Sequence, residues 1–516
     1  MTEIVIGSRI LDVLTTGMYP DALDAIREYI QNSFDAIRRA EYVEILKPNF
    51  GEVEISIDAG ERVVTIRDNG IGIPKAEAGT TLLSIGASKK KIGDDAGFRG
   101  IGRLAGLAYC EKLVFTTASN NEPCETELTF DAAAIRRSIS PISSSDDIET
   151  AAELLTRRTK TRNKDRKPGL PFFEVKLIGV NQRLFLDIDE VRTYLRQVAP
   201  VEFNMQAFVY GNSKINPFLD THGARKIINL KLGYNGRQEK VNKPYKTFHE
   251  AGNRANNRVD IVDIETYVDP SPSHSWIAWL SKSRHLTGTI NAEDVRGIRL
   301  RANNIQIGNY NTFSRIFEKV RKTHSRFNGW FSGEVHILDP GVIPNSRRDF
   351  FEDNEAWREV ERTLTEWAKE LARRAYQNSS DRNRPVELIE GDTDEFIEEV
   401  HKETAQGFTS ESEREQVLQD IADREQQIDK AITSNRTDEE KAGLLRKKEI
   451  VSQLRKNASK PRSLIDESEL NRDERKVLRL VMNIVYKACG AESARLVAEE
   501  VNRKLKERAR QPVGNL

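Results

Sequence analysis

The feature that most constrains this chain is an amphipathic stretch near its start, at residues 20–40. Apolar side chains recur there at the three- and four-residue spacing of one helix face, namely Leu23, Ile26, Ile30, Phe34 and Ile37. Pro20 and Asp21 are typical of a helix start. The sequence therefore predicts a helix with one buried side, against which the following segments must pack.

Three polar residues, Glu28, Asn32 and Asp35, share another side of this helix, because they are spaced i, i+4 and i+7. At about 100° per residue, that side lies nearly opposite the apolar stripe. Taken alone, polar residues opposite an apolar stripe are typical of a solvated helix face. The segments that follow favour a different interpretation.

A β-hairpin and two glycine-rich segments follow the helix. Residues 53–57 and 63–66 alternate between apolar and polar residues and flank Ala59-Gly60, which predicts two paired strands. The hairpin leads into the turn Asp68-Asn69-Gly70-Ile71-Gly72-Ile73-Pro74. A later loop consists of Gly97, Phe98, Arg99, Gly100, Ile101 and Gly102, and an apolar stretch follows it. Glycine-rich backbone at the start of a helix offers free amide groups to a phosphate.

Together these segments resemble the three motifs of the GHKL ATPases. The E-x-x-x-N-x-x-D-A helix, the D-N-G-I-G-I-P turn and the G-F-R-G-I-G loop occur in the family's order between residues 28 and 102. The superfamily includes type II topoisomerases, ninety-kilodalton heat-shock chaperones, histidine kinases, MutL proteins and MORC proteins. The resemblance implies ATP and Mg²⁺ as ligands and an α/β sandwich of the Bergerat type at residues 1–180.

The resemblance assigns catalytic roles to the polar side of the first helix. Glu28 is expected to act as the general base that orients and deprotonates water. Asn32 is expected to ligate Mg²⁺ through its amide oxygen, since magnesium takes few protein oxygens besides phosphates and water. Asp35 is expected to be a water-mediated or structural neighbour of the nucleotide.

The adenine end of the site is expected at the turn after the hairpin. Asp68 would accept a hydrogen bond from the adenine amino group, which guanine lacks at that position. Gly70 and Gly72 would let the turn pass beside the base. A threonine on the strand predicted at residues 112–117 would also contact adenine. Thr116 and Thr117 both fit, and Thr117 is preferred.

The phosphate end is expected at residues 97–102, with added charge from two other places. Lys89 lies where MutL and MORC proteins carry a Ser-Lys pair in the lid over the nucleotide, and it would reach a phosphate. Asn345-Ser346-Arg347-Arg348 resembles the heat-shock chaperone segment that sends an arginine to the γ-phosphate. The motif does not distinguish Arg347 from Arg348, and a surface arginine pair at a helix start remains the alternative.

The rest of the chain is expected to form two further parts. Residues 185–390 predict a mixed α/β, transducer-like domain, with a helix at 188–198 and an amphipathic helix at 357–376. Residues 391–516 predict a helical or coiled-coil region, and the polar residues 379–410 predict a linker that overlaps its start. A short heptad at 418–432 suits either a coiled coil or a helical hairpin. Residues 132–168 predict an insertion whose basic run, at 157–167, is a mobile loop or, less favoured, a contact to nucleic acid or to an acidic partner.

Composition limits the class of protein. Lys+Arg and Asp+Glu both number 80, so the net charge of +0 gives no overall signal for nucleic acid. The three cysteines, Cys110, Cys124 and Cys489, lack metal-type spacing and suit a reducing compartment. No leader pattern and no membrane-length apolar run is evident, so we expect a cytoplasmic protein without membrane contact.

The resemblance therefore implies an ATP-hydrolysing clamp that closes as a nucleotide-dependent homodimer on a protein client or on DNA. The alternative is an ATP-binding switch or scaffold without significant hydrolysis, in a DNA-repair or antiviral complex. A histidine kinase is disfavoured because no phosphoacceptor helix precedes the ATPase motifs. A topoisomerase is disfavoured because so short a chain offers no tyrosine domain after them.

Overall fold

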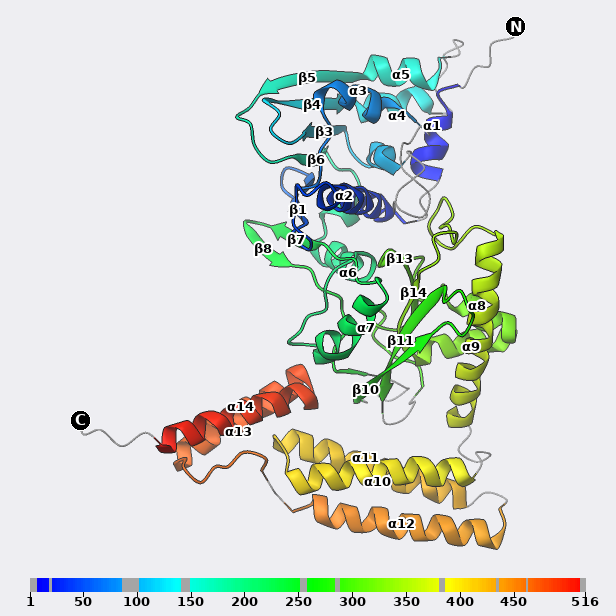
Figure 1. Cartoon of the computed structure of the whole chain (residues 1–516), viewed down its shortest axis with the longest axis vertical. Coiled ribbons are helices and arrows are strands. Elements are labelled where there is room, and N and C mark those ends of the chain that lie inside the picture. Colours follow the sequence, from blue (N-terminus) through cyan, green and yellow to red (C-terminus); the bar gives the residue numbers. More distant parts are fainter. Residues whose placement is uncertain are drawn as a thin grey trace, which may run out of the picture.

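The computed structural model of the chain describes residues 7–17, 21–85, 102–140, 149–250, 258–283, 288–379, 386–432, 436–460 and 463–510. A first sheet with its helices, a second sheet and a helical region follow one another along the longest axis of the molecule (Figure 1). This arrangement confirms the predicted fold class, an α/β sandwich followed by a mixed α/β part and a helical region. Within these ranges, no helix combines the length and apolar character needed to cross a membrane.

The predicted N-terminal helix is α2 (Asp24–Tyr42), and its apolar stripe is buried. The side chains of Ile30 and Phe34 are each 1% exposed. Glu28 and Asp35 on the polar side are only 7% and 2% exposed. This side is therefore not a solvated helix face, because other segments of the chain cover it.

The first sheet has eight strands in the order β5-β4-β3-β6-β2-β1-β7-β8. Its strands are β1 (Glu52–Asp58), β2 (Val63–Asp68), β3 (Lys112–Ala118), β4 (Cys124–Phe130), β5 (Thr159–Asp165), β6 (Phe172–Ile178), β7 (Asn229–Tyr234) and β8 (Arg237–Lys240). The predicted hairpin is β1 with β2, whose antiparallel register pairs Ile55 with Ile66. Buried and exposed residues alternate along β1, as expected for a sheet covered on one face.

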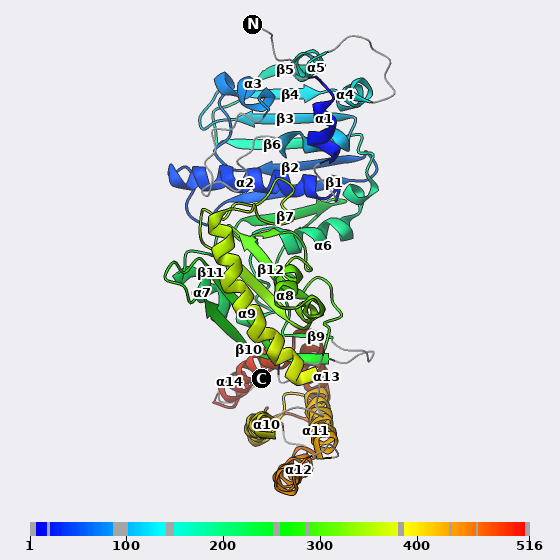
Figure 2. The same cartoon turned by 90° about the vertical axis from the view of Figure 1, so that its right-hand side faces the viewer.

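Helices cover that one face of the first sheet. Helices α1, α2 and α4 lie in front of the strands in Figure 2. The short helices of this part are α1 (Ile10–Asp12), η1 (Val13–Gly17), α3 (Lys75–Leu83), η2 (Gly102–Ala108), α4 (Ala132–Ile139), α5 (Ala151–Arg158) and η3 (Arg183–Leu186). One hydrophobic core joins Phe34 of α2, Ile135 of α4 and Leu154 of α5 to Val53 of β1. The result is a two-layer α/β sandwich.

Residues beyond 185 complete the same sheet. Helix α6 (Ile188–Val198) has the predicted bounds and places Val191 and Leu195 in the first core. Strand β7 then runs parallel to β1, with Leu230 opposite Val53. The first sheet therefore continues past residue 180, where the sequence placed the end of the first domain.

The insertion expected at residues 132–168 is partly regular structure. Residues 159–165 form the edge strand β5, which pairs antiparallel with β4 along its whole length. The mobile-loop interpretation of the basic run is wrong for these residues, because backbone pairing with β4 orders them. Their side chains are almost all exposed, which is why no apolar alternation indicated a strand.

The second sheet has six strands in the order β13-β12-β14-β11-β10-β9. They are β9 (Phe248–Glu250), β10 (Arg258–Val268), β11 (Trp276–Ser283), β12 (Gly297–Ala302), β13 (Ile305–Ile307) and β14 (Ser332–Ile337). Both faces of this sheet are covered. Along β11, Trp276 and Ala278 belong to one hydrophobic core, and Ile277 and Trp279 belong to the other.

Helices around the second sheet close these two cores. They are η4 (Gly211–Ile215), α7 (Asn216–Thr221), α8 (Ser314–Val320), η5 (Lys322–Trp330) and α9 (Glu355–Ser379). Helix α9 confirms the amphipathic helix predicted at 357–376, and it packs Leu364 and Trp367 into the core that contains Trp276. Residues 338–354 connect β14 to α9 without a helix or a strand.

The C-terminal region contains α10 (Val386–Gln406), α11 (Glu411–Ile432), α12 (Asp438–Ala458), α13 (Arg472–Cys489) and α14 (Ala491–Arg510). The linker predicted at 379–410 is wrong over α10. Its buried residues follow an alternating three- and four-residue spacing that polar neighbours obscured, namely Val386, Ile389, Thr393, Phe396 and Val400. The heptad at 418–432 belongs to a helical hairpin, because α11 shares a core with α12 in the same chain.

Candidate nucleotide site

The carboxylate of Glu28 lies against the backbone of Gly102. A methyl group added at Gly102 would stand 1.9 Å from Oε2 of Glu28, so only glycine allows this approach. Gly102 begins the 3₁₀-helix η2, where the sequence predicted the start of a helix after a glycine loop. The first and third motifs therefore meet at the side chain expected to be the general base.

A tyrosine that is none of the defining residues of the three motifs holds η2 in place. Tyr29 follows Glu28 on α2, and its hydroxyl accepts a hydrogen bond from the Gly106 backbone at 2.9 Å. The same hydroxyl donates to the Arg103 carbonyl at 3.2 Å. Burial raises the pKa of the Tyr29 phenol, so it stays a neutral donor and acceptor. In the sequence, the only sign of this contact with η2 is the hydroxyl group of Tyr29 among apolar residues of the helix.

The second motif is bonded directly to α2. The Ile71 amide donates to the Ala36 carbonyl at 3.1 Å, and the Gly70 amide donates to Oδ1 of Asp68 at 2.9 Å. A methyl group at Gly70 would stand 2.6 Å from the Cβ of Ala36. Asp68 itself is 3% exposed and ends strand β2. The turn therefore depends on glycine because it lies directly against the helix.

Thr117 connects the other end of the turn to the sheet. Its hydroxyl accepts from the Ile73 amide at 2.8 Å and donates to the Phe172 carbonyl at 3.0 Å. Thr117 is fully buried, whereas Thr116 is half-buried and points to the other face of β3. Gly72 has φ +67°, and a methyl group there would stand 2.1 Å from the Ala118 carbonyl oxygen. Of the two threonines, Thr117 is thus the one joined to the turn.

The second part of the chain contributes an arginine to this site. Arg348 donates from Nε to Oε1 of Glu28 at 2.9 Å, and the two side chains are 8% and 9% exposed. Arg347 is exposed, although its backbone carbonyl accepts from Nη2 of Arg27 at 3.2 Å. The surface-pair alternative is therefore wrong for Arg348, and α9 begins only at Glu355.

A tight turn presents Arg348 to α2. The Arg348 amide donates to the Asn345 carbonyl at 3.0 Å, and the Asn345 side chain donates to Oδ1 of Asp349 at 2.6 Å. Arg348 has φ +55°, which is uncommon for a residue with a side chain. Such a conformation persists where the surrounding structure holds it, and it marks this turn as a candidate functional segment.

A buried polar network connects the same part of α2 to α6. Nη2 of Arg27 lies 3.1 Å from Oδ1 of Asp24, and the Tyr194 hydroxyl donates to that oxygen at 2.7 Å. Burial raises the pKa of Asp24, while the Arg27 charge and the Tyr194 hydrogen bond act in the opposite direction. Arg27 therefore links α6 to the turn that carries Arg348.

The remaining candidate residues divide into two groups. Asn32 is half-buried and Asp35 is buried on α2, in line with Glu28 as their spacing predicts. Lys89, Gly97, Phe98, Arg99, Gly100 and Ile101 lie outside the described residues. The structure thus brings Glu28, Gly102 and Arg348 together near one end of α2, and it joins Thr117 of β3 to the turn that contains Asp68, Gly70 and Gly72.

This fold and site define a class of protein. Residues 21–161 match the family described as histidine kinase-, DNA gyrase B- and HSP90-like ATPases. The N-terminal part of the chain is therefore a GHKL-type ATPase domain, as the three motifs predicted.

Within this class, the chain is similar to heat-shock chaperones. Heat shock protein 90-5, chloroplastic, of Arabidopsis thaliana is 30% identical over 132 residues, which cover 22% of this chain and 17% of that protein. Chaperone protein HtpG of Wolinella succinogenes is 25% identical over 133 residues, which cover 22% of each chain. Chaperone protein HtpG of Yersinia pestis is 25% identical over 143 residues, which cover 24% of this chain and 23% of that protein. The match thus spans less than a quarter of each relative.

Proposed function

We propose that this protein is a Mg²⁺-dependent ATPase whose nucleotide-driven closure acts on a macromolecular client. The observation that carries the proposal is the position of Glu28. Its carboxylate lies against Gly102 of the third motif and forms an ion pair with Arg348 from the second part of the chain. A nucleotide that displaced the Glu28 carboxylate would therefore change its contacts with both the phosphate loop and the second part of the chain.

Glu28 is the proposed general base. Hydrolysis of the γ-phosphate requires an oriented water, neutralisation of charge and exclusion of bulk solvent. A buried carboxylate at the end of the phosphate loop, against Gly102, suits the first requirement. Arg348 donates a hydrogen bond to Oε1 of Glu28, whereas Arg347 is exposed. Arg348 is therefore the proposed cation for the γ-phosphate. A guanidinium has five N–H donors and can contact a carboxylate and a phosphate together.

The nucleotide would extend from the turn to the phosphate loop. Asp68, at the buried end of β2, is proposed to accept from the adenine amino group, and Thr117, which is bonded to Ile73 of the same turn, is proposed as a second adenine contact. Asn32 fits a magnesium ligand, since it offers an amide oxygen one helical turn after Glu28. When bound, Mg²⁺ would neutralise phosphate charge. Residues 97–102 and Lys89 are proposed to hold the phosphates from the loop and the lid.

Closure as a homodimer is part of the proposal. One observation that supports a second copy as partner is an exposed apolar stripe on α13. Val477, Leu480, Val481 and Ile484 follow one helix face and are 61%, 61%, 45% and 57% exposed. Contiguous apolar surface of this kind is typical of an interaction site.

The similarity to chaperones supports a protein client, and one feature favours DNA as the alternative. The edge strand β5 exposes Lys160, Arg162 and Lys164, of which Lys164 pairs with Glu127. A basic edge can attract phosphates, but its charge is partly neutralised within the sheet. A protein client is therefore the primary proposal, and DNA is tested beside it.

A second candidate function is an ATP-dependent switch without significant hydrolysis. The ion pair that supports the first proposal also favours this one, because Arg348 already occupies one oxygen of the proposed base. If that ion pair persisted with ATP bound, Glu28 would have only Oε2 for a water, and Oε2 faces Gly102.

ATP turnover and sedimentation of the wild type and Glu28→Ala separate the two candidates. We expect the wild type to hydrolyse ATP, and the variant to bind ATP without turnover and to accumulate as a dimer. Stimulation by duplex DNA would shift the proposed client from protein to DNA. A wild type that binds ATP but neither hydrolyses it nor dimerises would exclude the clamp and leave the switch.

A further inference from the structure

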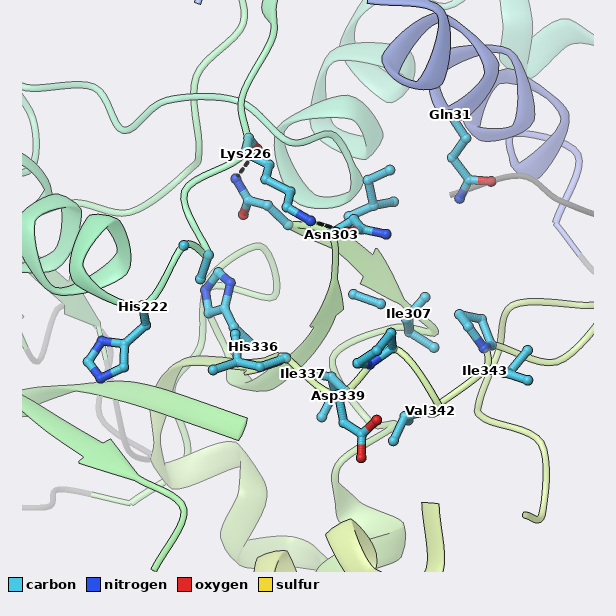
Figure 3. A pocket seen from close by; sticks show the side chains of 18 of the residues that line it. Gln31, His222, Lys226, Asn303, Ile307, His336, Ile337, Asp339, Val342 and Ile343 are labelled. Carbon is cyan, nitrogen blue, oxygen red and sulfur yellow. Dashed lines mark hydrogen bonds between the residues drawn. The ribbon is translucent and has the colours of Figure 1, made fainter. Parts of the chain in front are cut away.

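A pocket of about 270 Å³ lies between α2 and the second sheet. Its walls come from four places, which are Gln31 on α2, the segment around Lys226, the turn at Asn303 and the connection at residues 337–344 (Figure 3). The volume is near the lower end of small-molecule pockets, roughly 300–1,000 Å³. The nucleotide site described above uses the neighbouring residues Glu28 and Asn32 of α2 but not Gln31.

The Gln31 side chain has no hydrogen-bond partner among the residues that the structure describes. It is 1% exposed, and within the described ranges neither its amide nitrogen nor its amide oxygen forms a hydrogen bond. In Figure 3 its side chain extends from α2 toward the strands on the opposite wall. Leaving a buried donor and acceptor unpaired costs about 1–3 kcal/mol for each group. A ligand with an adjacent acceptor and donor would satisfy both groups at once.

His336 offers a second unpaired group in the same pocket. Its Nε2 lies 3.1 Å from Oε2 of Glu334, which assigns the ring proton to that nitrogen. Nδ1 is then an acceptor, and it is buried with no hydrogen-bond donor near it in the part of the chain that the structure describes. Burial lowers the pKa of His336 to about 4, so the ring is neutral near pH 7.

The charges on the pocket wall nearly balance. Lys226 contributes a cation whose Nζ donates to Oδ1 of Asn303 at 2.7 Å, and Asp339 contributes an anion. Arg348 lines one end, where Glu28 neutralises it. The balance disfavours both a strong anion and a strong cation as ligand.

The remaining wall is apolar. Side chains that line it come from the end of the second sheet and from the connection to α9, and they include Ile305, Ile307, Ile337, Val342, Ile343 and Pro344. Such a surface suits a compact hydrocarbon or an aromatic ring. The pocket thus combines an apolar body with a few unpaired polar groups.

We propose that this pocket binds a small uncharged carboxamide or lactam on an apolar body. Its amide would pair with the Gln31 side chain through one donor and one acceptor, and its ring would lie on the isoleucine wall. A further N–H of the ligand would reach Nδ1 of His336. The ligand is distinct from ATP, because it needs no phosphate contact.

Occupancy of the pocket would join α2 to the second part of the chain. Gln31 lies on α2 three residues after Glu28, and Arg348 lines the pocket while it pairs with Glu28. A ligand held between these elements would change how readily Arg348 leaves Glu28. This consequence rests on the proposed function, whereas the binding site itself does not.

Three probes of nearly equal shape test the proposed ligand class on the full chain without nucleotide. They are benzamide, which is neutral, benzoate, which is an anion, and benzamidinium, which is a cation. Titration by saturation-transfer NMR is expected to show benzamide binding with a Kd on the order of 1 mM, as is typical of fragments. Benzoate and benzamidinium are expected to bind at least about tenfold more weakly, since each places a net charge in the pocket.

Variants at two walls locate the binding. Gln31→Leu keeps the size of the side chain and removes both amide groups, so benzamide affinity should fall about tenfold. Lys226→Met should weaken benzamide less, and Gln31→Glu should shift the preference to benzamidinium. Gln419→Leu, at an exposed position on α11, is the matched control and should leave benzamide binding unchanged. Circular dichroism checks that each variant is folded.

Two results would overturn the proposal. One is benzamide binding that is absent from the wild type, or that is the same in the wild type, Gln31→Leu and Lys226→Met. The other is stronger binding of benzoate or benzamidinium than of benzamide to the wild type. Because no nucleotide is present, these results do not depend on whether the protein hydrolyses ATP.

Discussion

Arg348 and Glu28 are 320 positions apart in the sequence, and Nε of Arg348 donates to Oε1 of Glu28 at 2.9 Å. Glu28 belongs to α2 of the first sheet's helical layer, and Arg348 belongs to the connection between the second sheet and α9. Both side chains are more than nine-tenths buried. This ion pair is therefore a direct electrostatic link between the ATPase domain and the part that follows it.

Removing Arg348 should destabilise the junction between the two parts. Arg348→Met keeps most of the side-chain length but leaves the Glu28 carboxylate buried without its cation. Breaking one partner of a buried ion pair costs about 3–5 kcal/mol. We expect a loss near the lower end, about 3 kcal/mol in the free energy of unfolding, because Glu28 lies at the edge of the nucleotide site. Urea unfolding at about pH 7 measures it.

The control for this prediction is Arg347→Met, at the exposed neighbouring position, which should change the free energy by less than about 0.5 kcal/mol. The double variant Glu28→Gln/Arg348→Met should recover much of the loss, since no charge is then left unpaired. A single Arg348→Met variant as stable as the wild type would show that the ion pair does not hold the two parts together.

A methyl group at Gly102 should impair hydrolysis by displacing the proposed base. In Gly102→Ala the new carbon would stand 1.9 Å from Oε2 of Glu28, so the carboxylate must move. Moving a catalytic group by about 1 Å typically lowers turnover about 10²-fold. Steady-state ATP hydrolysis measures the effect, with nucleotide binding followed separately. Gly79→Ala, on α3 with no atom of the described residues within 4 Å of the added carbon, should hydrolyse ATP like the wild type.

Gly72→Ala should destabilise the turn through both its backbone conformation and a clash. Gly72 has φ +67°, and its added carbon would stand 2.1 Å from the Ala118 carbonyl oxygen. Gly236 has φ +74° with no atom within 4 Å, so Gly236→Ala isolates the conformational cost of about 1 kcal/mol. We expect Gly72→Ala to lose at least about 2 kcal/mol more than Gly236→Ala in thermal or urea unfolding. Equal losses would mean that the turn moves away from β3 at little cost.

Stability should depend on pH through His336. Burial lowers its pKa from 6.5 to about 4 in the folded chain. Between these values the unfolded chain binds more protons at this site than the folded chain, so stability falls as the pH falls from 6.5 to 4. Over this range His336 alone lowers the free energy of unfolding by roughly 3 kcal/mol.

His336→Gln keeps a donor for Glu334 but does not titrate in this range, so its unfolding free energy should fall less between about pH 7 and about pH 4 than that of the wild type. His401→Gln changes an exposed histidine on α10 and should retain the pH dependence of the wild type. Parallel curves for the wild type and His336→Gln would contradict a buried, neutral His336.

The local elements of the ATPase domain could be predicted because their signals are periodic and short in range. The stripe of Leu23, Ile26 and Ile30 predicts α2, since a helix that buries one side repeats apolar residues every three or four positions. Alternation predicts β1 and β2, and the bounds of α6 are as expected. Edge strand β5 and helix α10 were not predicted, because charged or polar residues obscure the apolar pattern of each.

The sequence by itself determined which residues share one side of α2, because helical spacing fixes the order of Glu28, Asn32 and Asp35. Only the tertiary structure decided that Arg348, and not Arg347, meets Glu28. That contact depends on a turn with φ +55° and on the packing of the second part against α2. Neighbouring residues in the sequence carry no signal for such a contact, since long-range packing alone brings its two sides together.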